Sequence, residues 1–223
     1  MDRYVSLAEQ AYEYLRNMIK SGQLKQNEVY SETKLCKEIG VSRTPMRDAL
    51  MRLSQDKYID ILPSKGFRLH KMTKNDIWNT YQIRTAIEGF CAINLQQQRN
   101  TEAGRKTIRE LKVDLALMKE AIEERATYEV ILSYDLDFHD KMVKFTDNSD
   151  MISLFESYKH LLSDIAFKSF EQQGRPLEAY HEHKEIYQML VAEDEKLVKE
   201  LYQSMMKHME ASRDIALELM DKE

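Results

Sequence analysis

Apolar residues recur at helical spacing through the first part of the chain. A first helix is predicted over 7–20 by apolar positions three or four residues apart, namely Leu7, Ala11, Leu15, Met18 and Ile19. Two shorter helices are predicted over 32–39 and from Ser42 to about Gln55, because a serine suited to N-capping precedes each. The segments "YIDIL" and "FRLHK", separated by "PSKG", then predict a β-hairpin. Three helices and a hairpin within residues 1–72 would make a complete small domain.

From Thr73 onward the pattern is helical throughout. Breaks between the periodic segments fall at "RNT", near Thr127, and at "TDNSD", "QQGRP" and "AEDE". The predicted helices therefore cover 74–97, 102–126, 128–146, 149–171, 175–192 and 195–221. Helices of this number and length are typical of one bundle, here over residues 73–223. The predicted fold class is mostly α, with a small mixed domain followed by an all-helical one.

Charge is unevenly distributed along the chain. Residues 1–72 hold 13 Lys and Arg against 9 Asp and Glu, whereas the remainder holds 20 against 29. A basic segment on an acidic body indicates a polyanion-binding module joined to a part that does not touch polyanions. Random surface variation could produce the same difference, so the motifs have to decide between the two.

Cysteine usage and hydropathy indicate the compartment. Cys36 and Cys91 lie far apart without a pairing pattern, which is typical of small buried residues in a reducing environment. Neither the N-terminal "MDRYVSLAEQ" nor any later segment has the apolar run of a signal peptide or a membrane span. We therefore expect a soluble, cytoplasmic protein with no membrane partner.

The segment "GVSRTPMRDAL" carries the most informative pattern in the chain. Ser42 can cap the helix, and Pro45 falls in its first turn, where a missing N–H costs nothing. Arg43 and Arg47 lie one turn apart on the outward face with Thr44 beside them. The inward face is the apolar stripe Met46, Ala49, Leu50 and Leu53. With the preceding helix and the tight "IGVS" connection, this predicts a helix-turn-helix whose second helix enters the DNA major groove. A solvated helix face would explain two arginines, but not the cap, proline, turn and hairpin together.

The helix predicted over 128–146 places two ligating residues on its apolar side. That side is formed by Val130, Ile131, Leu132, Leu136, Phe138, Met142 and Val143. Asp135 and His139, four residues apart, lie within it, whereas Asp137 and Asp140 face outward as solvated charges. A carboxylate among apolar neighbours is costly unless it is paired or coordinates a cation. For His139 taken alone, a hydrogen-bonded core histidine is the alternative.

Three more histidines lie in the last two predicted helices: His181 and His183 in "YHEHKEI", and His208 in "MMKHME". Imidazole and carboxylate groups donated by facing helices suit zinc, nickel, manganese or iron. We expect His181 to point away from the side of His183. Like His70 and His160, it is assigned no ligand role.

The N-terminal motifs resemble those of a known family. The segments "IKSGQL", "SETKLCKEIGVSRTPMRDALMRLSQDKYI" and "ILPSKGFRL" make residues 7–72 similar to the winged helix-turn-helix of GntR-family bacterial transcription regulators. The resemblance implies DNA contacts by Arg43, Thr44 and Arg47 and, at a wing tip that reaches the minor groove, by Lys65 and Gly66.

One position departs from that family pattern. The family usually has arginine where this chain has Thr33, with Lys34 next. The DNA contact that relatives make there is therefore weakened or moved, and Lys34 is the residue that would take it over.

The helical part resembles the FCD ligand-binding domain of the FadR-like group, in its six-helix VanR-type branch. Matching "D…FH" and "EHKEI" to metal-binding FCD domains implies three ligands for a divalent metal, zinc or nickel: Asp135, His139 and His183. In that family a final histidine follows an acidic helix cap by about three turns. Asp194 resembles the cap, Met205 holds the expected position, and His208 lies one turn further on. Either His208 is the fourth ligand in a shifted register, or this chain lacks that ligand.

Arg84 and Glu88 lie one turn apart in "YQIRTAIEGF". One interpretation is an exposed ion pair. The family resemblance implies instead that Arg84 faces an effector cavity, where its planar guanidinium would bind a carboxylate.

We therefore expect a ligand-responsive transcription regulator, by family default a repressor, that binds a pseudo-palindromic operator as a homodimer. A small carboxylate metabolite in the bundle would act through its differential affinity for two arrangements of the DNA-binding domains. The alternatives are a metal-dependent enzyme fused to a DNA-binding module, and a regulator whose effector pocket holds no metal. We favour a protein that is not an enzyme, because the sequence has no obvious general base for the Asp/His cluster and no nucleophile motif.

Overall fold

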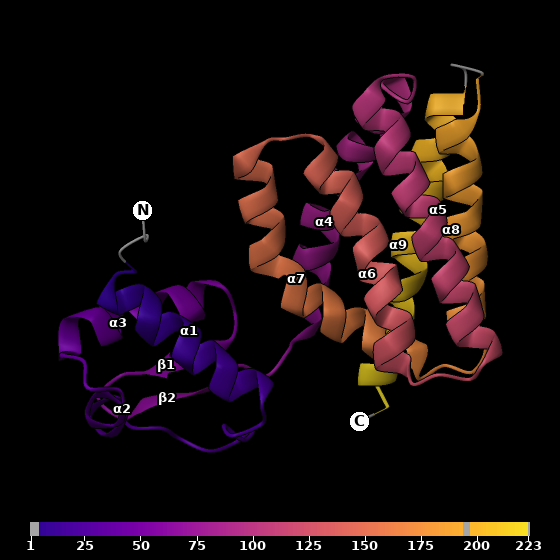
Figure 1. Ribbon diagram of the computed structural model, residues 1–223. Coiled ribbons are helices and arrows are strands. Elements are labelled where there is room, and N and C mark those ends of the chain that lie inside the picture. Colours follow the sequence, from indigo (N-terminus) through magenta and orange to yellow (C-terminus); the bar gives the residue numbers. More distant parts are fainter. Residues whose placement is uncertain (1–4, 194–196, 223) are drawn as a thin grey trace. The chain divides into compact units, whose positions relative to one another are not determined.

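The computed structural model describes residues 5–193 and 197–222 and divides into two compact units, residues 1–72 and 73–223 (Figure 1). The described residues form nine helices and one two-stranded hairpin, so the predicted mostly-α fold class is confirmed. Asp194, expected to cap the last helix, lies outside the described residues. Among the helices that are described, none is both long enough and apolar enough to cross a membrane.

The first unit is a three-helix domain with a hairpin. α1 (Leu7–Lys20) packs on α3 (Arg43–Gln55), and α2 (Glu32–Ile39) leads into α3 through a tight turn. Gly40 ends α2 in the left-handed conformation, with φ 75°, which glycine adopts without strain. The inward stripe predicted for α3 is buried: Met46, Ala49, Leu50 and Leu53. These side chains join the core of the unit, and the opposite face of α3 is left exposed.

The hairpin is a wing built from β1 (Ile59–Leu62) and β2 (Gly66–Leu69), paired antiparallel. Tyr30 adds a bridge that the sequence did not predict. Its N–H donates to the Phe67 carbonyl at 2.7 Å, and the Phe67 N–H donates to the Tyr30 carbonyl at 3.1 Å. Gly66 has a φ of 116°, and a Cβ there would lie 2.0 Å from the Tyr30 carbonyl oxygen. Only glycine permits this approach, so Gly66 fixes the wing against the segment before α2.

The second unit is a helical bundle. Its described helices are α4 (Lys74–Gln97), α5 (Glu102–Glu123), α6 (Tyr128–Phe145), α7 (Ser149–Phe170), α8 (Arg175–Val191) and α9 (Val198–Met220). α4 begins with a capping box, in which Thr73 accepts from the Asp76 N–H and Asp76 accepts from the Thr73 N–H. α4 packs on α6 and α9, and α8 packs on α5 and α9, which brings α6, α8 and α9 around one interior.

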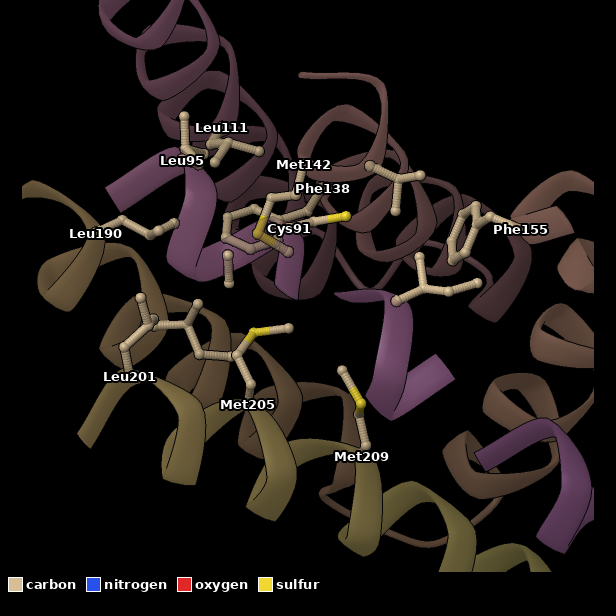
Figure 2. Packing of buried hydrophobic residues seen from close by; sticks show 14 of the residues in the cluster. Cys91, Leu95, Leu111, Phe138, Met142, Phe155, Leu190, Leu201, Met205 and Met209 are labelled. Atoms are coloured by element: carbon tan, nitrogen blue, oxygen red, sulfur yellow. The ribbon is translucent and has the colours of Figure 1, made fainter. Parts of the chain in front are cut away.

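The main core of this unit is apolar (Figure 2). It joins side chains from all six of the described helices of the unit, among them Cys91, Leu95, Leu111, Phe138, Met142, Phe155, Leu190, Leu201 and Met205. Met205 holds the position where the family pattern places the final histidine, and here it is buried in this apolar cluster.

Two details of the predicted burial pattern of α6 are wrong. Val130, assigned to the apolar side, is 42% exposed, because it lies in the first turn, where the neighbouring helices do not cover it. Asp140, assigned to the solvent, is buried and lies 3.1 Å from Nζ of Lys159, which α7 brings over it, and 2.6 Å from Nζ of Lys144. Asp137 is exposed, as predicted. Periodicity identifies the faces of a helix, but it does not say which neighbour covers them.

Candidate metal centre and DNA-binding surface

The N-terminal end of α3 presents polar side chains at the surface. Arg43, Thr44 and Arg47 are all exposed there. Nε of Arg47 lies 3.1 Å from Oε1 of Glu32 in α2, and 66% of the Arg47 side chain stays exposed. This ion pair uses only Nε, and no described residue is hydrogen-bonded to Nη1 or Nη2. Those two nitrogens are the edge with which arginine binds guanine or phosphate bidentately.

The other residues expected at DNA also lie on the surface of the first unit. Lys34 is exposed on α2, with a carboxylate oxygen of Glu38 4.0 Å from its Nζ. Lys65 is exposed in the turn between β1 and β2. Gly66 is half-buried against Tyr30, so its contribution to a contact would come from the backbone.

Four potential metal ligands meet inside the second unit. Asp135 and His139 come from successive turns of α6, His183 comes from α8, and His208 comes from α9. All four are buried, and one ligating atom of each lies within 4.8 Å of those of the other three. His139 Nε2 lies 3.0 Å from His183 Nε2 and 3.2 Å from His208 Nε2. Asp135 Oδ1 lies 3.5 Å from His183 Nε2. The structure thus brings His208 into the cluster despite its shifted spacing in the sequence.

Each of the three imidazoles has an oxygen next to its other ring nitrogen. His183 Nδ1 lies 2.7 Å from the Ala179 carbonyl oxygen, one turn earlier in α8. His208 Nδ1 lies 2.8 Å from Glu182 Oε2, and His139 Nδ1 lies 2.5 Å from Glu88 Oε2. Carbonyl and carboxylate oxygens accept hydrogen bonds, so a neutral ring at His183 or His208 would carry its proton on Nδ1 and its lone pair on Nε2. Nδ1 of His139 and Oε2 of Glu88 are close but are not aligned for a hydrogen bond.

The electrostatics of the cluster fit a cation. Burial lowers the pKa of His139 and of His208 well below the ordinary histidine value, so both rings are neutral at pH 7. Nε2 of His139, Nε2 of His208 and a carboxylate oxygen of Asp135 then lie close together with no proton between the two rings, an arrangement that is repulsive unless a positive ion joins them. Three imidazoles and one carboxylate are a donor set suited to a divalent transition metal. The outer hydrogen bonds of His183 and His208 resemble those that orient the imidazole ligands of metal sites in general.

Arg84 and Glu88 form a buried pair, so the interpretation as an exposed pair is wrong. Arg84 is 6% exposed and Glu88 is fully buried, with Nε and Oε1 2.7 Å apart. α6 and α9 cover this face of α4, which the sequence could not show. Burial raises the pKa of Glu88, and the Arg84 guanidinium opposes that rise. The second Glu88 oxygen is the one next to His139, so this pair borders the cluster.

Sequence reasoning missed three residues around the cluster: Glu88 as a neighbour of His139, and Glu182 and Arg175 behind His208. The spacing of Arg84 and Glu88 was a usable signal for the first. Nothing comparable pointed to Glu182, because its partner His208 lies 26 residues further along the chain.

The remaining histidines lie elsewhere among the described residues. His181 is exposed on α8, and His160 belongs to α7. In the first unit, His70 Nδ1 lies 2.7 Å from Asp60 Oδ1. None of the three contributes to the cluster of four ligands.

Comparison with known families matches both units. Residues 7–69 match the family described as "Bacterial regulatory proteins, gntR family", and residues 79–211 match the FCD domain. Together the two matches cover most of the described chain.

Individual proteins are similar to this chain over most of its length. The chain is 27% identical over 191 residues to the HTH-type transcriptional regulator YdhC of Bacillus subtilis, covering 86% of this chain and 84% of that one. It is 27% identical over 175 residues to the gluconate operon transcriptional repressor of Bacillus licheniformis, covering 77% and 68%. A solved structure of a GntR-type transcriptional regulator from Rhodococcus sp. RHA1 superposes with a TM-score of 0.67 at 18% identity, covering 94% and 97%. That last likeness shows the shared fold.

Proposed function

The chain belongs to the GntR family of bacterial regulatory proteins and carries an FCD domain, and we propose that it is a metal- and carboxylate-responsive repressor of transcription. The observation that carries this proposal is the pairing of two sites in one chain. The first unit has an exposed, arginine-bearing helix end, and the second has four buried ligating atoms within 4.8 Å of one another.

In the first unit, α3 would enter the major groove of an operator. Arg43, Thr44 and Arg47 would contact bases and phosphates from the exposed N-terminal end of that helix. Lys34 would bind the phosphate backbone from α2, and Lys65 with the backbone of Gly66 would reach the adjacent minor groove from the wing. Exposure of every side chain in this set supports the assignment, because none has to leave the core in order to bind.

In the second unit, a divalent metal would be held by Asp135, His139, His183 and His208. Zinc or nickel suits three imidazoles and one carboxylate, and a free coordination position would bind an effector oxygen. The metal supplies a positive charge that attracts an anionic ligand. The protein residues fix the imidazole orientations and exclude water from the surrounding core.

The effector would be a small carboxylate metabolite. Arg84 supports this assignment, because Glu88 engages only its Nε and no described residue is hydrogen-bonded to Nη1 or Nη2. Those two nitrogens can bind a carboxylate with two parallel hydrogen bonds. Effector binding would alter DNA affinity only as far as it favours one arrangement of the DNA-binding domains over another.

The assembly would be a homodimer on a pseudo-palindromic operator, since a two-fold symmetric protein reads two half-sites. The name of the Bacillus licheniformis relative supports repression as the mode of control. A bacterial protein that binds an operator acts in the cytoplasm, so we propose that location for this protein. We assign no catalytic role to the cluster, because Glu88 and Glu182, the carboxylates beside its histidines, are already engaged by arginines.

A selection experiment tests the proposal. Random duplex DNA is selected on the purified protein, and recovered sequences are titrated with and without zinc, nickel and a panel of small carboxylates. We expect an inverted repeat to be enriched, and its affinity to change when metal and one carboxylate are present together. Recovery of no preferred sequence would contradict the DNA-binding assignment, and an affinity indifferent to every metal and carboxylate would contradict the effector assignment.

A further inference from the structure

A second arginine is buried in the helical unit, at the start of α8. Arg175 is 0% exposed, and its Nε and Nη1 have no hydrogen-bond partner among the described residues. Burial of a guanidinium is costly, and unpaired N–H groups add to that cost. Replacing a buried ion pair by apolar side chains is often neutral or stabilising. The stability of the core therefore does not account for Arg175.

A carboxylate at hydrogen-bond distance links Arg175 to the ligand cluster. Nη2 of Arg175 donates to Oε2 of Glu182 at 2.8 Å and to the Ser212 hydroxyl at 3.2 Å. The same Glu182 oxygen lies 2.8 Å from Nδ1 of His208. A single carboxylate oxygen therefore joins a buried arginine on α8 to a candidate ligand on α9.

We propose that Arg175 and Glu182 are positioning residues that fix the ring orientation and the tautomer of His208. This inference rests on the metal centre proposed above. Oε2 of Glu182 accepts a hydrogen bond from Nη2 of Arg175, and a carboxylate oxygen held in this way is an acceptor toward Nδ1 of His208 as well. Nδ1 of His208 must then carry the proton, and the lone pair of Nε2 is directed at Asp135, His139 and His183.

The contacts from Arg175 to Glu182 and from Glu182 to His208, called the relay below, explain how the fourth ligand can come from a shifted position in the sequence. Met205 occupies the expected position and belongs to the apolar core, so the ligand comes from one helical turn further along α9. Ser212 lies one more turn along the same helix and also contacts Arg175. Contacts at His208 and at Ser212 hold this stretch of α9 against α8, which sets the depth at which the imidazole enters the cluster.

A neighbouring carboxylate provides a matched control. Oε2 of Glu178 lies 4.0 Å from Nη1 of Arg175, on the same helix as Glu182, but its side chain is 61% exposed. No contact between Glu178 and His208 is found among the described residues. Glu178→Gln therefore removes a charge near Arg175 without touching the relay, whereas Glu182→Gln removes the acceptor of His208.

The first test is metal affinity of the full-length protein, measured by competition of Zn²⁺ with a chromogenic chelator. Glu182→Gln and Arg175→Gln should each weaken Zn²⁺ binding by about 10- to 100-fold, as changes outside the ligand set commonly do. Glu178→Gln should bind Zn²⁺ like the unaltered protein, and Arg175→Lys should restore part of the loss. Circular dichroism of each variant establishes that it is folded. Unchanged affinity in a folded Glu182→Gln or Arg175→Gln protein would overturn the inference, and loss in Glu178→Gln would show a general charge effect instead.

The second test needs no metal and therefore separates the relay from the metal centre. Long-range ¹H–¹⁵N NMR of the metal-free protein reports which ring nitrogen of His208 carries the proton. We expect the Nδ1–H form in the unaltered protein and in Glu178→Gln, and a mixture of tautomers in Glu182→Gln, because a glutamine amide can also donate. An Nε2–H form in the unaltered protein would overturn the inference. A protein with the Nδ1–H form that takes up no Zn²⁺ would overturn the metal centre and leave the positioning contact standing.

Discussion

The two units of this protein use arginine in opposite surroundings. In the first, Arg47 keeps 66% of its side chain exposed and shares only Nε with Glu32. In the second, Arg84 and Arg175 are buried and face Glu88 and Glu182, each of which lies beside a histidine of the candidate metal centre. An exposed guanidinium is available to a partner from outside, while a buried one must be matched by a charge inside the same fold. The same side chain is thus open to an outside partner in one unit and paired with a carboxylate inside the fold in the other.

The largest expected effect comes from breaking the buried pair. Glu88→Ala leaves the Arg84 charge buried without its partner, and we expect about 3–5 kcal/mol lower stability of the second unit. Denaturant unfolding followed by circular dichroism measures this change. The matched control is Lys106→Ala on α5, which breaks an exposed pair of the same one-turn spacing with Glu110 and should cost about 0.3–0.5 kcal/mol. Equal losses in the two variants would mean that burial does not separate these pairs.

Metal binding should give the next largest effect, confined to the second unit. At a zinc concentration of about a hundred times Kd, mass action adds about 2.7 kcal/mol to the stability of the metal-binding state. Chelation should therefore lower the Tm of the unit, and added zinc should restore it. His139→Ala should abolish the response, whereas His181→Ala should keep it, because that side chain is exposed and outside the cluster. An identical response in both variants would contradict the ligand set.

Arg47→Ala tests the exposed side of the comparison. If Arg47 reads a base, operator binding should weaken by about 1–3 kcal/mol, the usual loss for one bidentate contact. Fluorescence anisotropy with the selected operator and with a scrambled duplex measures both affinities, and only the first should fall by that amount. Unchanged operator affinity would exclude α3 as the reading helix, while the Tm of both units should stay the same because the side chain is exposed.

Lys65→Ala should have the smallest effect. An exposed lysine that contacts a phosphate contributes equally to all sequences, so affinity should fall for operator and scrambled duplex alike. The slope of log K against log salt should flatten by about 0.9, the value for one phosphate contact. A salt titration measures this slope. Loss confined to the operator would show a base contact instead.

The sequence could predict the features that depend on local spacing, but not those that depend on packing between distant segments. The apolar stripe of α3 and its exposed arginines follow from local spacing, and the structure confirms the buried stripe. The burial of Asp140 and of the Arg84–Glu88 pair could not be predicted, because it depends on which helix packs over each face. The bridge from Tyr30 to Phe67 and the contact from Glu182 to His208 join residues far apart in the chain, and no periodicity carries that information.

The candidate cluster was predictable in part for the same reason. Asp135 and His139 share one face of one helix, so their spacing alone placed them together. His183 and His208 required the family resemblance, and the shifted register of His208 left its role open. The structure brings His208 Nε2 to 3.2 Å from His139 Nε2, with α9 packed against α8 and His208 Nδ1 2.8 Å from Glu182 Oε2.

X-ray absorption spectroscopy of the protein loaded with one equivalent of zinc tests the central claim most directly. The account predicts a zinc centre with about three imidazole nitrogens and carboxylate oxygen, all near 2.0–2.2 Å, and the multiple-scattering signature of histidine. His139→Ala should reduce that signature, and His181→Ala should leave it unchanged. A spectrum with oxygen neighbours alone, or one that does not respond to His139→Ala, would contradict a metal centre built from Asp135, His139, His183 and His208.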